Sequence, residues 1–336
     1  MDTVVLLPAY NPNIMMLKTL RELQSEDFGI LVVNDGSAKE FSELFDEAQK
    51  YAVVLSYEKN HGKGYALKYG MQKIKEYFPD AVRFITADAD GQHSTEDICN
   101  IREKMRGGDD FILGTRDFKG NTPLRSRVGN SMSRLVFAVS TGYYLSDNQS
   151  GLRGFDLCHV PWMVNVNGNR YEYEMNVLIC AVKQKIKILT VPIKTIYIDD
   201  NRSSHFNPVR DTLRIHKNMF FGAGGSLISV FLSIIAVALF DIFFGWSLWP
   251  LRLYALGIFS VVLSWALNRF VWYRAFAFKG DKRLIFSAIL RWILYVLVIL
   301  AIHTVLPVLS LTFCYIVTIF VVMVGEYFTR KFTAHS

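Results

Sequence analysis

The sequence has few cysteines, and their spacing would not organise a fold. The four in 336 residues are Cys99, Cys158, Cys180 and Cys314. They show neither metal-site nor disulfide-framework spacing, so we interpret them as reduced thiols in a cytosolic or membrane setting. The first ten residues, MDTVVLLPAY, lack a basic segment followed by a long apolar stretch. We therefore expect no signal peptide.

Two common nucleotide-binding signatures are also missing. A Rossmann dinucleotide site needs a glycine-rich turn after the first strand, but the turn here is PAYNPN at 8–13, without glycine. The segment HGKGYALKYG at 61–70 contains Gly-Lys-Gly but lacks the spacing and the Ser or Thr of a P-loop. These absences exclude a Rossmann dinucleotide site and P-loop ATP hydrolysis.

Charge is scarce in the C-terminal part of the chain. The sequence is 51% hydrophobic, and this excess lies mainly after about Asn218. Residues 220–240 contain no charged side chain, and this length crosses a hydrocarbon core of roughly 30 Å. Buried helices of a soluble protein would need polar faces, which these segments almost lack. We predict an all-α transmembrane domain of four helices over 220–328, with spans at about 220–240, 249–268, 284–302 and 307–325.

The basic residues that flank the spans predict how they are oriented. They lie between the second and third spans and after the fourth, at Arg269, Arg274, Lys279, Lys282, Arg283, Arg330 and Lys331. The positive-inside rule then places the N-terminal domain and both termini in the cytoplasm of a multi-pass cell-membrane protein. The net charge of +7 is explained by this flanking, and we expect no nucleic-acid partner.

The segment 206–219 has a pattern of its own. Phe206, Val209 and Leu213 recur at helical spacing, with Arg210 and Arg214 between them. This pattern predicts an amphipathic juxtamembrane helix on the membrane surface. A plain connecting helix is the alternative.

The N-terminal domain, 1–205, alternates strand and helix. The predicted strands are 3–10, 29–37, 51–60, 81–90 and 110–117, and the helical patterns are 13–25, 41–51, 64–78 and 95–106, the last capped by Ser94 or Thr95. Continuous apolar strands that alternate with helices indicate an α/β, Rossmann-like, mostly parallel sheet covered on both faces. Ligands of such sheets bind at the carboxyl ends of the strands.

Acidic residues follow two of these strands. Asp88 and Asp90 come directly after an apolar run, where an unpaired charge costs free energy. Such a pair suits Mg²⁺ or Mn²⁺, which prefer oxygen ligands and bridge diphosphates. Asp35 follows the second strand and could accept a hydrogen bond from a nucleobase N–H. Each Asp alone is typical of a turn or cap, but together they indicate a nucleoside diphosphate bound through a metal.

Six motifs in order carry a family resemblance: PAYNP, VVNDGS, NHGKGYALKYG, DADGQH, GTR and DNQSGLRGF. Over about 3–218 the chain resembles family 2 glycosyltransferases with the GT-A fold, in the polyprenyl-phosphate branch that includes dolichol-phosphate mannose synthase. The C-terminal part, with NRFVWYRAFAFKG, looks like a GtrA-like four-span domain. The resemblance implies transfer of a hexose from a UDP- or GDP-sugar to a polyprenyl phosphate.

The resemblance also implies roles for individual residues. Asp88, Asp90 and Gln92 would hold the metal. Pro8, Tyr10, Asn11 and Asp35 would hold the nucleoside, with Lys63 near the nucleotide. Arg116 and one of Arg125 or Arg127 would hold the acceptor phosphate, and Gln149 and Arg153 would line the site. Catalysis would then depend on Asp90, Arg116, Arg127 and Arg153.

The chemistry of a phosphate acceptor fits what the sequence lacks. Transfer to a hydroxyl needs a general base, and the Gln-x-x-Arg-Trp motif of polysaccharide synthases is absent. A phosphate monoester, with a second pKa of about 6, is already largely a dianion at neutral pH. Arginines can hold it in line with the sugar. Arg202, in RSSHF, would close over the diphosphate or guide the lipid phosphate, and a solvated linker is the alternative. Glu172 or Glu174 could act as a base, but we expect at least one to be structural, bonded to nearby arginines.

Three functions stay open from the sequence. The first is transfer to undecaprenyl or dolichyl phosphate, which would supply cell-envelope glycosylation. The second is a transferase that acts on a hydroxyl acceptor. The third is a lipid-linked sugar flippase with an accessory transferase domain. The membrane domain would flip the product, or anchor the enzyme and assist homo-oligomerisation. The sequence does not identify the sugar.

Overall fold

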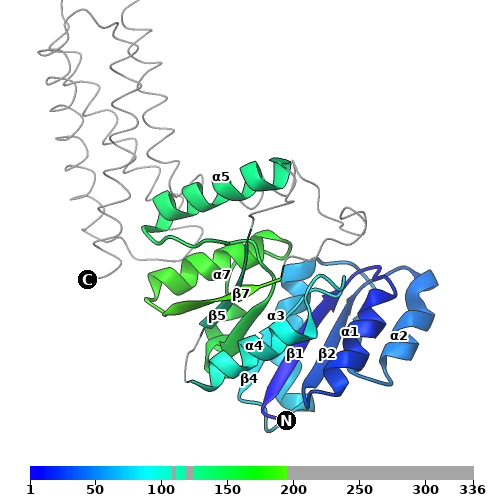
Figure 1. Ribbon diagram of the computed structural model, residues 1–336. Coiled ribbons are helices and arrows are strands. Elements are labelled where there is room, and N and C mark those ends of the chain that lie inside the picture. Colours follow the sequence, from blue (N-terminus) through cyan, green and yellow to red (C-terminus); the bar gives the residue numbers. More distant parts are fainter. Residues whose placement is uncertain (108–110, 118–123, 195–336) are drawn as a thin grey trace, which may run out of the picture. The chain divides into compact units, whose positions relative to one another are not determined.

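The computed structural model describes residues 1–107, 111–117 and 124–194 (Figure 1). The chain divides into two compact units, the first of which comprises Met1–Arg134 and Leu145–Ile215. The second comprises Leu135–Tyr144 and His216–Ser336, and it lies almost entirely outside the described residues. The predicted juxtamembrane helix, the four predicted spans and the domain boundary at 205 lie outside them as well. Within the described part, no helix has both the length and the apolar character needed to cross a bilayer.

The first half of the described domain alternates strand and helix, as predicted. Its strands are β1 (Thr3–Ala9), β2 (Gly29–Asp35), β3 (Val53–Tyr57) and β4 (Arg83–Thr86), and its helices are α1 (Met15–Gln24), α2 (Ser42–Ala48), α3 (Lys63–Tyr77) and α4 (Thr95–Arg106). A 3₁₀ turn at Lys39–Phe41 precedes α2. β1 pairs in parallel with β2 and with β4, and β2 pairs in parallel with β3. β1 and β2 are buried along most of their length, which explains why both read as continuous apolar runs.

The second half adds three strands and three helices. These are β5 (Phe111–Arg116), α5 (Leu124–Thr141), β6 (Arg153–Asp156), α6 (Val160–Met163), α7 (Glu172–Lys183) and β7 (Ile188–Ile193), with a 3₁₀ turn at Leu157–His159. The sheet order is β3-β2-β1-β4-β6-β5-β7. β6 runs antiparallel between β4 and β5, and β7 is parallel to β5. The expected mostly parallel α/β sheet of a GT-A domain is confirmed, and β6 is its antiparallel member.

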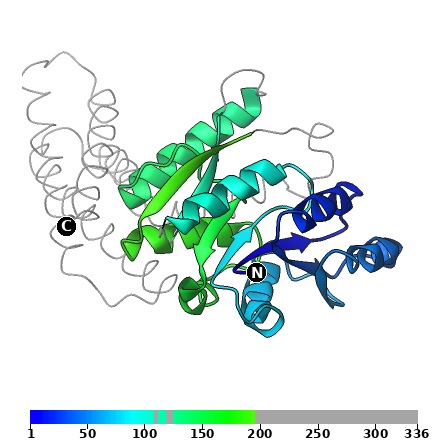
Figure 2. The ribbon, with the colours of Figure 1, turned by 60° about the horizontal axis from the view of Figure 1, so that its bottom comes forward.

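Helices cover both faces of the sheet (Figures 1 and 2). On one face, Val5 and Leu7 of β1 share a buried cluster with residues of α1, α2 and α4. On the other face, Gly70 lets α3 pack closely on β1. A Cβ built on Gly70 would lie only 2.3 Å from Leu6 Cδ1. The alternating side chains of β1 are therefore buried on both sides. This arrangement leaves the strand ends as the place where polar side chains can gather.

Helix α4 begins where one of the two predicted caps places it. The Ser94 hydroxyl oxygen accepts a hydrogen bond from the Asp97 backbone N–H at 3.1 Å. The Asp97 carboxylate accepts in turn from the Ser94 hydroxyl, at 2.7 Å, and from the Lys194 backbone N–H, at 3.2 Å. Ser94 is thus the N-cap, and Asp97 joins the start of α4 to the end of β7.

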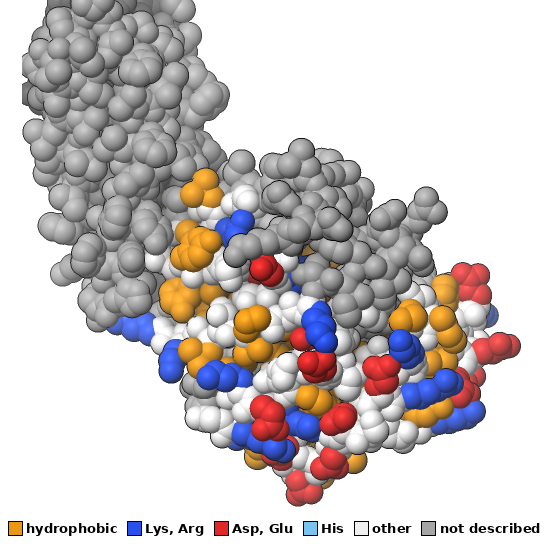
Figure 3. All heavy atoms as spheres, in the orientation of Figure 1, with side chains coloured by type: hydrophobic (Ala, Val, Ile, Leu, Met, Phe, Trp, Pro, Cys, Tyr) orange, Lys and Arg blue, Asp and Glu red, His pale blue; other side chains and the backbone are white. Residues whose placement is uncertain are grey.

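The two ends of the sequence differ in charge. Residues 1–194 carry 24 Lys or Arg and 24 Asp or Glu, whereas residues 195–336 carry 13 and 6. The whole net charge of +7 therefore belongs to the second segment. On the face drawn in Figure 3, acidic and basic side chains are interspersed over the described residues. In the first segment the acidic and basic residues are equal in number, and several of them form ion pairs near the carboxyl ends of the strands.

Candidate active site

A cavity of about 450 Å³ opens at the carboxyl ends of β1, β2 and β4. Its lining consists of the loop residues Pro8, Ala9, Tyr10, Asn11, Pro12 and Asn13, together with Asp35, Asn60, Gly62, Lys63, Asp88, Ala89, Asp90, Arg170 and Tyr171. The structure thus brings together all the residues predicted to hold the nucleoside, the predicted nucleotide neighbour Lys63 and both metal-binding aspartates. The roles assigned to them stay predictions.

Asp35 organises one wall of the cavity. Its Oδ1 accepts hydrogen bonds from the Tyr57 hydroxyl and the His61 backbone N–H, both at 2.8 Å. Its Oδ2 accepts from Asn60 Nδ2 at 3.0 Å and from the Gly62 backbone N–H at 2.9 Å. Burial, and then the hydrogen bond to Asp35, raise the pKa of Tyr57 well above its ordinary value. Asp35 therefore fixes the turn that leads into α3, and a nucleobase N–H would have to share oxygens that already accept protein donors.

Asn11 joins the first two strand-end loops. Its backbone has a positive φ of 46°, which asparagine tolerates better than most residues. The Asn11 N–H donates to Ser37 Oγ at 2.9 Å, and Asn11 Oδ1 accepts from the Ala38 N–H at 3.0 Å. The loop after β1 is thus held to the loop after β2, and Tyr10, 39% exposed, lines the cavity beside it.

A group of charged side chains lies on the β4 side of the cavity, and we name it the carboxylate cluster: Lys63, Asp88, Asp90, His93 and Glu174. Lys63 Nζ lies 2.6 Å from Asp88 Oδ1 and 2.8 Å from Glu174 Oε2. Burial alone would lower the pKa of Lys63, but the charges of Asp88 and Glu174 outweigh it and the pKa is raised. Burial would likewise raise the pKa of Asp88, but Lys63 and then His93 hold it well below its usual range. Both groups are therefore charged at neutral pH.

Asp90 is the carboxylate of the cluster for which the described residues provide no ion pair. Burial and, second, the Asp88 charge raise the pKa of Asp90. Its Oδ1 accepts a hydrogen bond from the Gln92 backbone N–H at 3.0 Å. Gln92, predicted to ligate the metal, is not among the lining residues. Two carboxylates that repel each other beside a cavity fit a divalent cation, which would relieve this repulsion.

Gly151 explains part of the motif SGLRGF. A Cβ built on Gly151 would lie 2.6 Å from Asp88 Oδ2, so a larger residue would displace the carboxylate. The Gly151 carbonyl also accepts a hydrogen bond from the Thr86 hydroxyl at 2.8 Å. The backbone that leads into β6 therefore packs directly against the end of β4 and its aspartate.

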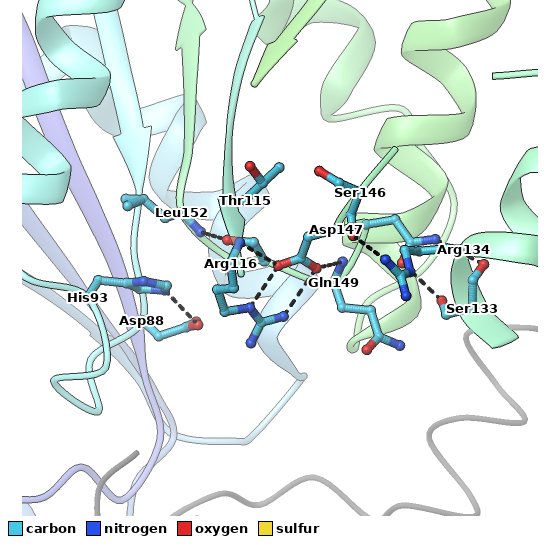
Figure 4. A network of polar contacts seen from close by, with 12 residues as sticks. Asp88, His93, Thr115, Arg116, Ser133, Arg134, Ser146, Asp147, Gln149 and Leu152 are labelled. Carbon is cyan, nitrogen blue, oxygen red and sulfur yellow. Dashed lines mark hydrogen bonds and ion pairs between the residues drawn. The ribbon is translucent and has the colours of Figure 1, made fainter. Parts of the chain in front are cut away.

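Arg116, predicted to hold the acceptor phosphate, is engaged within the protein. Its Nε and Nη2 donate to Asp147 Oδ2 and Oδ1 at 2.8 and 3.3 Å, and its backbone N–H donates to Oδ2 at 3.2 Å. The Asp147 side chain is only 1% exposed. Burial would raise the pKa of Asp147, but Arg116 outweighs it and holds the pKa low. Figure 4 shows this bidentate pair beside Asp88 and His93, and neither residue of the pair lines the cavity.

Arg153 and Gln149 also lie outside the cavity lining. Arg153 is 2% exposed and donates to the backbone carbonyls of Ser150 and Glu174 at 2.9 and 2.6 Å. Burial lowers its pKa, against the charge of Glu174. Arg153 therefore fixes α7 to the loop before β6. Gln149 is exposed and donates its backbone N–H to Asp147 Oδ1 at 3.0 Å.

Three further predicted site residues cannot be placed. The side chains of Arg125 and Arg127 in α5, and the whole of Arg202, lie outside the described residues. In addition, we named neither Arg170, Tyr171 nor Asp147 as a site residue from the sequence. The run NRYEYEMN at 169–176 was the available signal for the first two.

The Glu172 and Glu174 side chains both contact other parts of the protein. Glu172 Oε1 accepts the backbone N–H groups of Asn169 and Arg170 at 3.2 and 3.3 Å. Glu174 pairs with Lys63 through its carboxylate and with Arg153 through its carbonyl. Neither carboxylate lines the cavity, so their contacts favour the structural alternative over a base.

Comparison with known proteins shows the family. The model "Glycosyl transferase family 2" matches residues 4–168. An uncharacterised protein of Methanocaldococcus jannaschii is 34% identical, covering 62% of this chain and 87% of that protein. The UDP-N-acetylglucosamine–dolichyl-phosphate N-acetylglucosaminyltransferase of Methanococcus voltae is 32% identical and covers 58% and 86%. The polyprenol monophosphomannose synthase of Mycolicibacterium smegmatis is 22% identical and covers 57% and 76%. The chain belongs to glycosyl transferase family 2.

Proposed function

We propose that this glycosyltransferase moves a hexose or N-acetylhexosamine from a nucleotide-diphosphate sugar to a polyprenyl phosphate. The observation that carries the proposal is the carboxylate cluster, in which Asp88 and Asp90 line a cavity at the strand ends with one charge uncompensated. The names of two relatives add support, because both state transfer to a dolichyl or polyprenol phosphate. We include an N-acetylhexosamine among the transferred sugars because the first of these relatives is named as an N-acetylglucosaminyltransferase.

Asp88 and Asp90 would hold Mg²⁺ or Mn²⁺ together with the diphosphate. Within the described residues, no group of three or more His, Cys, Asp and Glu side chains is arranged to hold a metal. A pair of carboxylates suits a cation that keeps its other positions for phosphate oxygens and water. When bound, the cation would neutralise the leaving diphosphate. Lys63 keeps Asp88 charged and oriented for this role.

The acceptor follows from the acids available at the cavity. Of the three that line it, Asp35 is occupied by four protein donors, and Asp88 is paired with Lys63. Asp90 is the remaining carboxylate, and we assign it to the metal. A phosphate dianion needs no base, because it loses no proton before it attacks the sugar. A hydroxyl acceptor would need one, so the site favours the phosphate.

We further propose a membrane setting for the reaction. The apolar segments within 220–328 support a GtrA-like four-span domain. The basic residues that flank them support cytoplasmic termini and a cytoplasmic active site. The lipid-linked product would then supply cell-envelope glycosylation, with the membrane domain as anchor, homo-oligomer contact or flippase.

The experiment incubates membranes that contain the full chain with one labelled nucleotide sugar at a time, Mg²⁺ or Mn²⁺, and undecaprenyl phosphate. UDP-N-acetylglucosamine, UDP-glucose, UDP-galactose and GDP-mannose are the donors, and a parallel reaction replaces the lipid phosphate by undecaprenol. We expect one donor to give label in the organic phase with the phosphate and none with the alcohol. Equal transfer to the alcohol would establish the hydroxyl-acceptor alternative instead.

A further inference from the structure

The cations predicted for the site are mostly neutralised by the protein itself. Lys63 lies between Asp88 and Glu174, and Arg116 is held bidentately by Asp147. Arg153 is buried against two backbone carbonyls and does not line the cavity. An anionic ligand that entered the cavity would therefore compete with carboxylates for Lys63. It needs another cation, or a metal, to offset the three lining aspartates.

Arg170 supplies such a cation. It lines the cavity and is exposed, and no ion pair or guanidinium hydrogen bond of Arg170 is found among the described residues. Lys63 and Arg170 are the two cations of the lining, and only Lys63 is paired with carboxylates. The Arg170 charge is therefore available to a ligand.

The loop that carries Arg170 is fixed in place. Glu172 Oε1 accepts the N–H groups of Asn169 and Arg170, and the Asn169 carbonyl accepts the Tyr65 N–H at 3.0 Å. The stem of Arg170 packs on Gly62, where a built Cβ would lie 2.5 Å from Arg170 Cγ. Gly62 has a φ of 102°, a backbone conformation that residues other than glycine rarely adopt. Arg170 thus reaches the cavity over the turn that precedes Lys63.

We propose that Arg170 binds the diphosphate of the nucleotide sugar. This inference rests on the proposed function and names the residue that receives the anion. The position of Arg170 favours the diphosphate over the acceptor phosphate. It packs on Gly62, next to Lys63, and shares one cavity with Asp88 and Asp90, whereas Arg116, which was predicted to hold the acceptor phosphate, lies outside the lining. Guanidinium suits this role because its donors match two phosphate oxygens at once.

The test measures nucleotide binding to the purified full chain in detergent, with Mn²⁺ present, for UDP, GDP and uridine. Arg170→Ala should weaken binding of whichever diphosphate the wild type binds by about tenfold, the order expected when a charged hydrogen-bonding partner is removed at an accessible site. Uridine binding should not change. Arg170→Lys should stay within about threefold of wild type, because the charge is kept and the fork is lost. Arg106→Ala is the matched control, since it removes an exposed arginine from the last turn of α4, outside the cavity lining.

Each outcome bears on one claim. Equal diphosphate affinity in wild type and Arg170→Ala would overturn the inference and leave the proposed function standing. A raised KM for polyprenyl phosphate with unchanged diphosphate affinity would assign Arg170 to the acceptor and also overturn it. Equal losses of uridine and diphosphate binding would show that the effect of Arg170 does not depend on the diphosphate, which would overturn the inference. Failure of the wild type to bind either UDP or GDP would contradict the proposed function itself.

Discussion

The carboxylate cluster and the Arg116–Asp147 pair are both ion-paired groups beside strands of one sheet, yet they differ in what they leave open. In the pair, one carboxylate meets one guanidinium through two side-chain hydrogen bonds, and Asp147 is sealed from solvent. In the cluster, Lys63 serves two carboxylates, and Asp90 remains beside them on the cavity wall. In the pair one negative charge is matched by one positive charge. The cluster, by contrast, has more carboxylates than cations, and two of these carboxylates line the cavity, where a ligand can reach them.

This difference distinguishes structural residues from candidate ligand-binding residues more clearly than residue type does. Arg116 is the last residue of β5 and Asp88 comes two residues after β4, so both lie at strand ends and from the sequence both qualified as site residues. The structure shows that a charge paired within the protein, as Arg116 is with Asp147, can fix the backbone without lining the cavity. On the proposed function, the excess charge, rather than the presence of charge, distinguishes the side of the sheet edge where the ligand would bind. Four changes test this distinction.

The largest effect is expected from Asp88→Asn, which breaks the cluster. It removes a carboxylate proposed to hold the metal and leaves Lys63 with one partner. Loss of an electrostatic contact of this kind typically costs about a hundredfold or more in rate. Label transfer to the lipid phosphate, measured in membranes, checks this. Asp46→Asn, an exposed change in α2, is the control and should keep full activity. Full activity of Asp88→Asn would remove the metal from the mechanism.

Asp147→Asn should act on stability instead. It weakens hydrogen bonds to a charged guanidinium in a buried place, which costs about 2 kcal/mol. Because the folded pKa of Asp147 is lowered, its stabilisation is present above the ordinary pKa and is lost as the pH falls through the folded value. Denaturant unfolding of the full chain at neutral pH measures the loss. Nucleotide affinity should stay within about twofold of wild type, and a loss like that of Asp88→Asn would place the pair inside the site.

Gly151→Ala should disturb the cluster by steric contact, without changing any of its charges. The added Cβ would meet Asp88 Oδ2 at 2.6 Å, so the carboxylate must shift, and we expect about a tenfold loss of Mn²⁺ affinity, equivalent to about 1.4 kcal/mol. Gly129→Ala is the matched control, because among the described residues nothing outside its own helix backbone and chain neighbours lies within 4 Å of the Cβ built there. It should leave affinity unchanged and raise helix stability by up to about 1 kcal/mol. Equal metal affinity in both variants would show that Asp88 tolerates the displacement.

The smallest effect is a pH dependence that belongs to the cluster. The folded pKa of Asp90 is raised, so a proton competes with a cation there at pH values above the ordinary carboxylate pKa of about 3.9. Mn²⁺ affinity, followed by electron paramagnetic resonance, should therefore rise with pH through this range. Without metal, the stabilisation linked to Asp90 is present below its ordinary pKa and is lost as the pH rises through the folded pKa. Asp90→Asn should flatten the affinity profile, and an unchanged profile would refute this assignment.

The sequence predicted the parallel strands well and the added strands poorly. β1 to β5 are largely apolar runs between turn residues, so composition located them, although β3 is only partly buried. β6 has only four residues, RGFD, with a charge at each end, and no period can be recognised over that length. β7 contains Pro192, which argues against a strand interior. Its position at the edge of the sheet, beside β5 alone, removes that objection but cannot be read from the sequence.

The sequence predicted where the site lies, but it did not predict which residues contact one another there. Strand ends converge in any parallel sheet, so the gathering of Asp35, Lys63, Asp88 and Asp90 followed from topology. What each charge contacts depends on residues far along the chain. Asp147 meets Arg116 across 31 positions, and Glu174 meets Lys63 across more than a hundred. Such pairings leave no periodic trace in one sequence, so the four donors of Asp35 and the pairing of Arg116 with Asp147 could not be foreseen.

The place of β6 has a consequence for how the chain is made. One edge of β4 pairs with β1, but the other waits for β6, which lies about seventy residues later. At roughly 5–20 residues per second, a ribosome needs on the order of 4–14 seconds to deliver it. During that interval the nascent domain exposes an unpaired strand edge, a surface on which other chains can add. Binding by a chaperone during synthesis is therefore expected to matter most between the emergence of Thr86 and that of Asp156.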